Sequence, residues 1–196
     1  SVLPAAEPPK KEPCKRIYLH GFLGDKDHAA IKAFRKKLAD AEAGLGPNPD
    51  IVECLMIAGH VGLSFESDSP IIGFLPNPGS EPMWQVMKTL KARTSFPGKV
   101  GDDTYVFDAA KKRGLSVLKV EYVFPESEYN RLKAACDALR SSCDYEYGFP
   151  GAGDCNCASF PARIGFPIPE PTGQMLAYMD AMAKTPSPVR MGDCEG

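Results

Sequence analysis

Residues 151–160 read GAGDCNCASF and bring two glycines and two cysteines to the start of a segment that favours a short helix. A cysteine at a helix start lies at the positive end of the helix dipole, which favours the thiolate over the thiol. Glycine also lets a backbone come close to a reacting group. The stretch therefore predicts a reactive Cys157, preceded by Asn156, with Cys155 as the rival nucleophile.

A nucleophilic cysteine needs a base, and the chain has three histidines. His60 stands at the start of the strand-like run HVGLSF, just after Ala58-Gly59. An imidazole within hydrogen-bond reach holds a thiolate as an ion pair and later protonates the leaving group. These residues predict a pair of Cys157 and His60. The alternative is a small buried cysteine and an unrelated core histidine.

Composition limits the classes of protein to consider. The 196 residues are 43% hydrophobic and 24% charged with a net charge of -2, as expected of one soluble globular domain. The absence of a basic excess argues against a nucleic-acid partner. No apolar run approaches the ~18 residues of a transmembrane helix, and the start SVLPAAEPPKKEPCKR does not read as a signal peptide.

Hydrophobic periodicity gives the fold class. We expect a flexible Pro-rich lead-in over residues 1–15, a single domain over 16–185 and a frayed tail over 186–196. Strands are predicted at 17–22, 51–57, 60–65, 71–75 and 115–124, and helices at 28–44, 82–93, 128–141 and 172–184, while 102–112 is ambiguous. Because the best strands are hairpin-like, the pattern predicts an α+β fold with a mainly antiparallel sheet packed against several helices.

The cysteines leave more than one interpretation open. Their number is odd, so at least one is free or pairs between chains; they are Cys14, Cys54, Cys136, Cys143, Cys155, Cys157 and Cys194. We expect Cys14 and Cys194 to be exposed thiols. The close pair Cys155 and Cys157 suggests zinc, but structural zinc usually takes two ligand pairs and the second is missing, so we expect no metal.

Three further motifs have structural alternatives. The run His20–Gly24 resembles an oxyanion loop of α/β-hydrolases, but the chain lacks the Gly-x-Ser-x-Gly elbow, which favours a plain strand end. Met175, Met179 and Met182 lie on one predicted helix face with Leu176 and are taken as core. The loop aromatics Tyr145, Tyr147 and Phe149 either wall a substrate cleft or only pack their loop.

Two parts of the chain resemble the circularly permuted papain-like cysteine hydrolases, a group that includes the PPPDE peptidases and the lecithin retinol acyltransferase-like enzymes. They are the strand His60–Ser64, with its hairpin to 71–74, and the run Asn156–Phe160. In those families the histidine strand comes first and an Asn-Cys at a helix start supplies the nucleophile. The resemblance covers roughly residues 51–165 and implies a permuted papain-like fold with Cys157 as nucleophile and His60 as base.

The resemblance also implies a function without a metal or other cofactor. It implies a thiol hydrolase of the cysteine protease, amidase or deamidase type, in which backbone N–H groups near Cys157 form the oxyanion hole. Some relatives orient the histidine with a polar residue on the next strand. Here residues 71–75 are apolar, which leaves Asn77, Ser69 and Glu66 as candidates, or a bare dyad.

The expected substrate is a protein, peptidoglycan or a lipid. A proline-rich lead-in joined to a compact hydrolase is typical of the effector domain of a delivered bacterial toxin, which would be secreted or delivered into a target cell, otherwise cytoplasmic, with an immunity protein as partner. The alternative is a non-catalytic binding domain in which Cys155 and Cys157 form disulfides.

Overall fold

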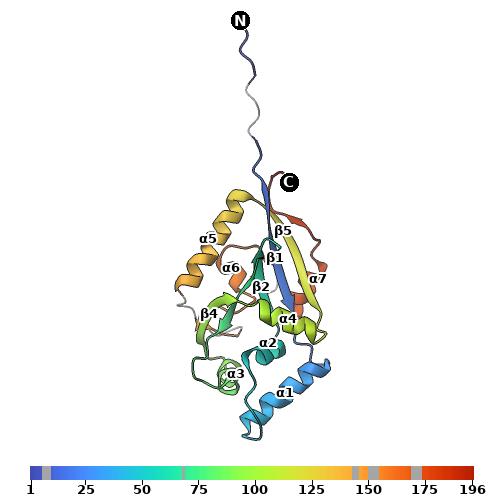
Figure 1. Cartoon of the computed structure of the whole chain (residues 1–196), viewed down its shortest axis with the longest axis vertical. Coiled ribbons are helices and arrows are strands. Elements are labelled where there is room, and N and C mark those ends of the chain that lie inside the picture. The colour runs from blue at the N-terminus through green and yellow to red at the C-terminus, as the bar shows by residue number, and fades with distance from the viewer. Residues whose placement is uncertain (6–9, 68, 143–145, 150–154, 169–173) are drawn as a thin grey trace.

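The computed structural model describes residues 1–5, 10–67, 69–142, 146–149, 155–168 and 174–196. Over these ranges the chain is an α+β fold with helices packed against one mixed sheet, which confirms the predicted class (Figure 1). Several residues singled out above lie outside the described ranges, namely Cys143, Tyr145 and the glycine-rich residues 151–154.

The sheet of the described chain has seven strands in the order β6-β4-β3-β2-β1-β5-β7. They are β1 (Cys14–Phe22), β2 (His60–Phe65), β3 (Ile71–Pro76), β4 (Phe96–Asp102), β5 (Val117–Pro125), β6 (Glu146–Tyr147) and β7 (Val189–Arg190). Neighbouring strands run antiparallel, except that β5 and β7 are parallel. The predicted hairpin is β2 and β3, and its twelve positions are all buried, as expected of strands covered on both faces.

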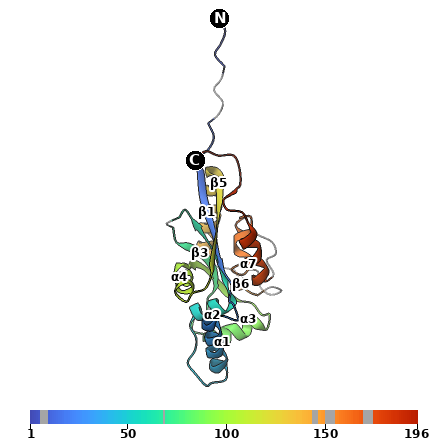
Figure 2. The same cartoon turned by 90° about the vertical axis from the view of Figure 1, so that its right-hand side faces the viewer.

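Helices cover both faces of the sheet. They are α1 (Ala29–Glu42), α2 (Ile51–Ala58), α3 (Met83–Lys91), α4 (Thr104–Lys112), α5 (Glu126–Ser142), α6 (Phe160–Arg163) and α7 (Met175–Lys184). Figure 2 views the sheet on edge, with α7 on one side and α4 on the other. The core on the α7 side includes Leu19 and Tyr178, and the core on the α4 side includes Phe22 and Phe107.

Residues 51–57 form helix α2, and the prediction of a strand there is wrong. The Asp50 side chain accepts a hydrogen bond from the Glu53 amide at 2.8 Å, and the Glu53 side chain accepts one from the Asp50 amide. This capping box stabilises the first turn of a helix. Gly59, at φ +80°, ends the helix. Capping and burial of Cys54, Leu55 and Met56 outweigh the strand propensity of Ile51 and Val52.

The ambiguous segment 102–112 is helical from Thr104 to Lys112, which form α4, and only Asp102 belongs to a strand, as the end of β4. Strand β4 itself has no predicted counterpart. The run Phe96-Pro97-Gly98 reads as a break in the sequence. In the structure Gly98 instead makes room for the Phe74 ring, because a Cβ at Gly98 would lie 2.3 Å from it. Proline is tolerated in a strand where its missing N–H is not needed for pairing.

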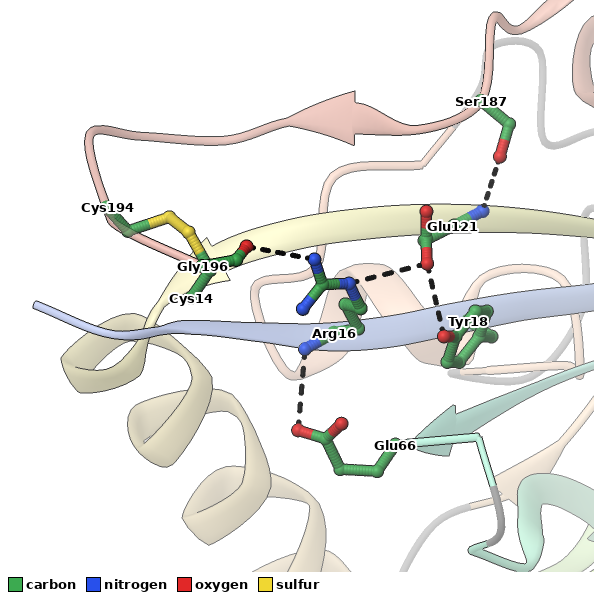
Figure 3. A network of polar contacts seen from close by, with 8 residues as sticks. All are labelled: Cys14, Arg16, Tyr18, Glu66, Glu121, Ser187, Cys194 and Gly196. Carbon is green, nitrogen blue, oxygen red and sulfur yellow. Dashed lines mark hydrogen bonds and ion pairs between the residues drawn. A yellow bond between two sulfur atoms is a disulfide. The ribbon is translucent and has the colours of Figure 1, made fainter.

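The tail is fastened to the sheet, so the expectation that it is frayed is wrong. Cys14 and Cys194 form a disulfide and are not exposed thiols. β7 pairs with β5 at Tyr122 and Val123. Figure 3 shows the surrounding polar contacts: Arg16 donates to the Gly196 carbonyl at 3.0 Å and pairs with Glu121, which also accepts from the Tyr18 hydroxyl. This clamp joins segments 180 residues apart.

Candidate active site

His60 is the first residue of β2 and comes directly after the glycine that ends α2. It pairs across the sheet with Phe22 of β1, and its side chain is fully buried. The Phe107 ring of α4 lies 5.6 Å from the imidazole, centroid to centroid. A helix end and a strand start therefore fix this histidine in an apolar environment.

Asp103 is the partner that holds the His60 ring. Its Oδ2 lies 2.5 Å from His60 Nε2, and both side chains are completely buried. Asp103 follows β4 at the N-cap of α4, where an aspartate normally bonds an amide of the first turn. Here its side chain makes no cap hydrogen bond. The Asp103 carboxylate binds the histidine instead, and α4 begins without a side-chain cap.

The residues predicted to orient His60 lie elsewhere. Asn77 and Ser69 are exposed. Glu66 follows the far end of β2, roughly 20 Å from His60 along an extended strand, and accepts a hydrogen bond from the Arg16 amide. Sequence reasoning missed Asp103, although an aspartate ahead of a helix-forming run is a visible signal for a helix N-terminus.

Cys157 lies in a turn held by Asn156. The Asn156 side-chain oxygen accepts hydrogen bonds from the amides of Ala158 and Ser159, both at 3.0 Å. Helix α6 begins only at Phe160 and is four residues long, so Cys157 does not open it. The dipole of so short a helix stabilises a thiolate only weakly. The turn fixes Cys157 in place, and the thiolate has to be stabilised by side chains around it.

Cys157 and His60 are brought together, from residues 97 positions apart in the chain. Burial alone lowers a histidine pKa, but Asp103 and the Cys157 side chain outweigh it and raise the pKa of His60 to about 10. Asp103 engages Nε2, which leaves Nδ1 for the thiol. Nδ1 has no well-formed hydrogen bond among the described residues, so the thiol and the ring are neighbours rather than a closed pair.

Cys155 is the weaker candidate for the nucleophile. Its sulfur lies 3.6 Å from the Ser159 hydroxyl, and burial raises the pKa of the Cys155 thiol. The Cys157 side chain, in contrast, interacts with the His60 ring and helps to raise its pKa. These interactions favour Cys157, which was predicted from its position after Asn156.

Tyr147 of β6 forms the inner wall of the site. Burial, and after it the interaction with Cys157, raises the pKa of Tyr147 well above its usual value of 10. The ring stacks on Phe74, 5.5 Å between centroids. Tyr147 is only 3% exposed, and Phe149 is partly buried against the same core, so neither lines an open cleft.

The other motifs contribute structure. The His20 ring shares a 2.8 Å hydrogen bond with the Ser64 hydroxyl, and burial, with Lys119 and Lys111, lowers the pKa of His20 to about 4. Met179 and Met182 are buried core residues, whereas Leu176 on the same helix is 60% exposed. Among the described residues, no group of three or more His, Cys, Asp or Glu side chains is placed to hold a metal ion.

Across the described part of the chain, no helix is both long and apolar enough to cross a membrane.

No family model, no curated protein and no solved structure matches this chain. The function of the site therefore has to be inferred from its own geometry.

Proposed function

We propose that this chain is a cysteine hydrolase that cleaves an amide or ester bond through an acyl-enzyme on Cys157. His60 serves as base and acid, and Asp103 orients its ring. The observation that carries the proposal is the convergence of these three buried side chains from separate parts of the sequence. A nucleophile, a base within reach and a third group that orients the base form the recurring signature of covalent hydrolysis.

In the first half of the reaction the Cys157 thiolate attacks the substrate carbonyl carbon and forms a tetrahedral oxyanion. The carbon–nitrogen or carbon–oxygen bond then breaks, and protonated His60 gives its proton to the departing amine or alcohol. Asp103 keeps Nε2 occupied, so the proton moves through Nδ1, the nitrogen on the Cys157 side. The product of this half is a thioester on Cys157.

In the second half water attacks the thioester carbonyl, and neutral His60 takes a proton from the water. The carbon–sulfur bond breaks, the carboxylic acid leaves, and the thiolate and the imidazolium are restored. The net reaction adds one water to the amide or ester and needs no other reactant. Protein, peptidoglycan and lipid substrates all offer such a bond, and delivery as a bacterial toxin with an immunity partner remains part of this proposal.

The alternative, a binding domain with Cys155 and Cys157 in disulfides, loses its main support. Both cysteines are free thiols in the structure, and the disulfide joins Cys14 to Cys194 instead. A reactive thiol beside a buried His–Asp pair is unnecessary in a binding domain. We therefore regard the hydrolase as the better explanation of the site.

Site-resolved alkylation tests the proposal. The protein is treated with iodoacetamide at pH 7, and the modified cysteines are identified by peptide mass spectrometry. We expect Cys157 to react first, and His60→Ala and Asp103→Ala to slow its modification. Because Cys157 is only 2% exposed, a small electrophile is the appropriate reagent.

Two other thiols serve as internal controls. Cys54 and Cys136 are each 1% exposed, and burial raises the pKa of Cys54 to about 12 and that of Cys136 to about 11. They resemble Cys157 in burial, and burial together with neighbouring carboxylates keeps them as thiols, so they should stay unmodified in the folded protein. Reaction of all three thiols at one rate, or no effect of His60→Ala, would contradict the proposed function.

A further inference from the structure

Three buried polar side-chain atoms have no hydrogen-bond partner among the described residues. They are His60 Nδ1, Asp103 Oδ1 and the Tyr178 hydroxyl. An unsatisfied buried polar group costs about 1–3 kcal/mol, so proteins keep few of them. Such costs are expected at functional sites. The proposed reaction uses the His60 and Asp103 side chains, but gives Tyr178 no role.

Tyr178 lies on α7, and its side chain is fully buried. Helix α7 crosses the sheet next to the histidine: a Cβ at Gly59, the residue before His60, would lie 2.8 Å from the Met175 side chain. Met179 and Met182 pack in the same way over Gly21 of β1. Tyr178 comes about one helical turn after Met175, so it lies on the part of α7 that packs beside Gly59 and the start of β2.

The Tyr178 hydroxyl is a donor that lacks an acceptor. Burial, and after it the nearby Cys157, raises the pKa of Tyr178 above its usual value of 10, so the phenol is neutral at physiological pH and keeps its proton. The neighbouring Tyr147 hydroxyl differs, since it already interacts with the Cys157 side chain and main chain. Attack by Cys157 on a carbonyl creates negative charge on the carbonyl oxygen, which is the acceptor that such a donor needs.

We propose that Tyr178 is the side-chain donor of the oxyanion hole and gives a hydrogen bond to the substrate carbonyl oxygen as Cys157 attacks. This inference rests on the proposed function. Tyr178 is then a catalytic residue for any amide or ester substrate, because every such substrate passes through the same oxyanion. Removal of one oxyanion donor typically costs about 10²–10³ in kcat.

Two reactions of the same thiol separate this role from others. Acylation by p-nitrophenyl acetate passes through an oxyanion, whereas alkylation by iodoacetamide displaces iodide from a saturated carbon and forms none. In Tyr178→Phe we expect the acylation rate to fall about 10²-fold while the alkylation rate of Cys157 stays at the wild-type value. Tyr129→Phe is the matched control, because Tyr129 is also a buried tyrosine but packs against Phe65, away from Cys157.

Stability gives an independent measurement. Replacing an unsatisfied buried hydroxyl by an apolar group of the same shape is neutral or stabilising, so Tyr178→Phe should unfold in urea at the wild-type midpoint or above it. A structural role, for instance through a bound water, predicts a lower midpoint and unchanged acylation. That result would overturn the proposal.

The remaining outcomes are also decisive. Equal acylation by wild type and Tyr178→Phe refutes the oxyanion role and leaves the hydrolase intact. A parallel fall in the acylation and alkylation rates means that Tyr178 affects the reactivity of the Cys157 thiol. That result also refutes the oxyanion role. If Cys157→Ser retains p-nitrophenyl acetate hydrolysis, the proposed function itself fails.

Discussion

The α-carbon of Gly73 lies against the Asp103 carboxylate: a Cβ at Gly73 would stand 2.0 Å from Asp103 Oδ2 and 3.2 Å from His60 Nε2. Gly73 is on β3, between the strand that begins with His60 and the strand that ends beside Asp103. Any side chain at this position occupies the space in which the hydrogen bond forms. The His60–Asp103 hydrogen bond therefore requires a glycine at position 73.

Gly73→Ala should therefore disable the site while leaving the sheet paired. The methyl group displaces the carboxylate, and misplacement by about 1 Å can cost on the order of 10²-fold in rate. We expect a loss of that size in Cys157 acylation by p-nitrophenyl acetate. Gly101→Ala is the matched control, since Gly101 faces Gly73 across β3 and β4 but a Cβ there meets nothing within 4 Å. Equal losses in the two variants would show that the effect is on the strand and not on the site.

Asp103→Asn should change how stability depends on pH. The folded-state pKa of His60 is raised from 6.5 to about 10, so the stability it contributes is complete below pH 6.5 and is lost as the pH rises toward 10. Asparagine can still accept the hydrogen bond but carries no charge. The difference in unfolding free energy between wild type and Asp103→Asn should be largest at pH 6 and smallest at pH 10, measured by urea unfolding. Asp102→Asn, an exposed neighbour, should not produce this trend.

The two ends of the candidate site could be found in the sequence because each has a local pattern. His60 opens an apolar hairpin of recognisable period, and Asn156-Cys157 precedes a short apolar run. The structure places both beside one another. The preference for Cys157 over Cys155 also comes from the local sequence, because Cys157 follows Asn156 and opens the segment Ala158–Phe160.

Asp103 could not be found in this way because its role depends on the order of strands. It reaches His60 only because β3 lies between β2 and β4 and carries glycine at the crossing point. Pro97 and Gly98 hide β4 in the sequence, and without β4 the aspartate has no predicted position. Similarly, the strand propensity of Ile51 and Val52 hides helix α2, because the capping box of Asp50 and Glu53 decides the structure there.

That capping box supports a prediction about α2, the helix that leads into His60. Asp50→Ala removes the hydrogen bond from the Glu53 amide and should lower the free energy of unfolding by about 1 kcal/mol. Asp50→Ser keeps an acceptor at the N-cap and should recover most of the loss. Urea unfolding of the three proteins measures both effects. An Asp50→Ala variant as stable as wild type would mean that packing alone holds α2.

The disulfide should contribute stability without affecting the chemistry. Cys14 and Cys194 are 180 residues apart, so their bond restricts most of the unfolded chain, and Cys14→Ser with Cys194→Ser should cost about 2–5 kcal/mol. Cys14 begins β1, whereas His60 pairs with Phe22 at its other end, roughly 26 Å away along the strand. Acylation of Cys157 per folded molecule should therefore match wild type.

Reduction with dithiothreitol checks the same point on the native sequence. It should lower the urea midpoint of the wild type to that of the double variant and leave the midpoint of the double variant unchanged, because the other described cysteines are free thiols. The acylation rate, measured well below the new midpoint, should be insensitive to the reductant. A loss of acylation on reduction, with the fold retained, would instead mean that a structural change at the disulfide and at Arg16 and Glu121 reaches the active site through β1.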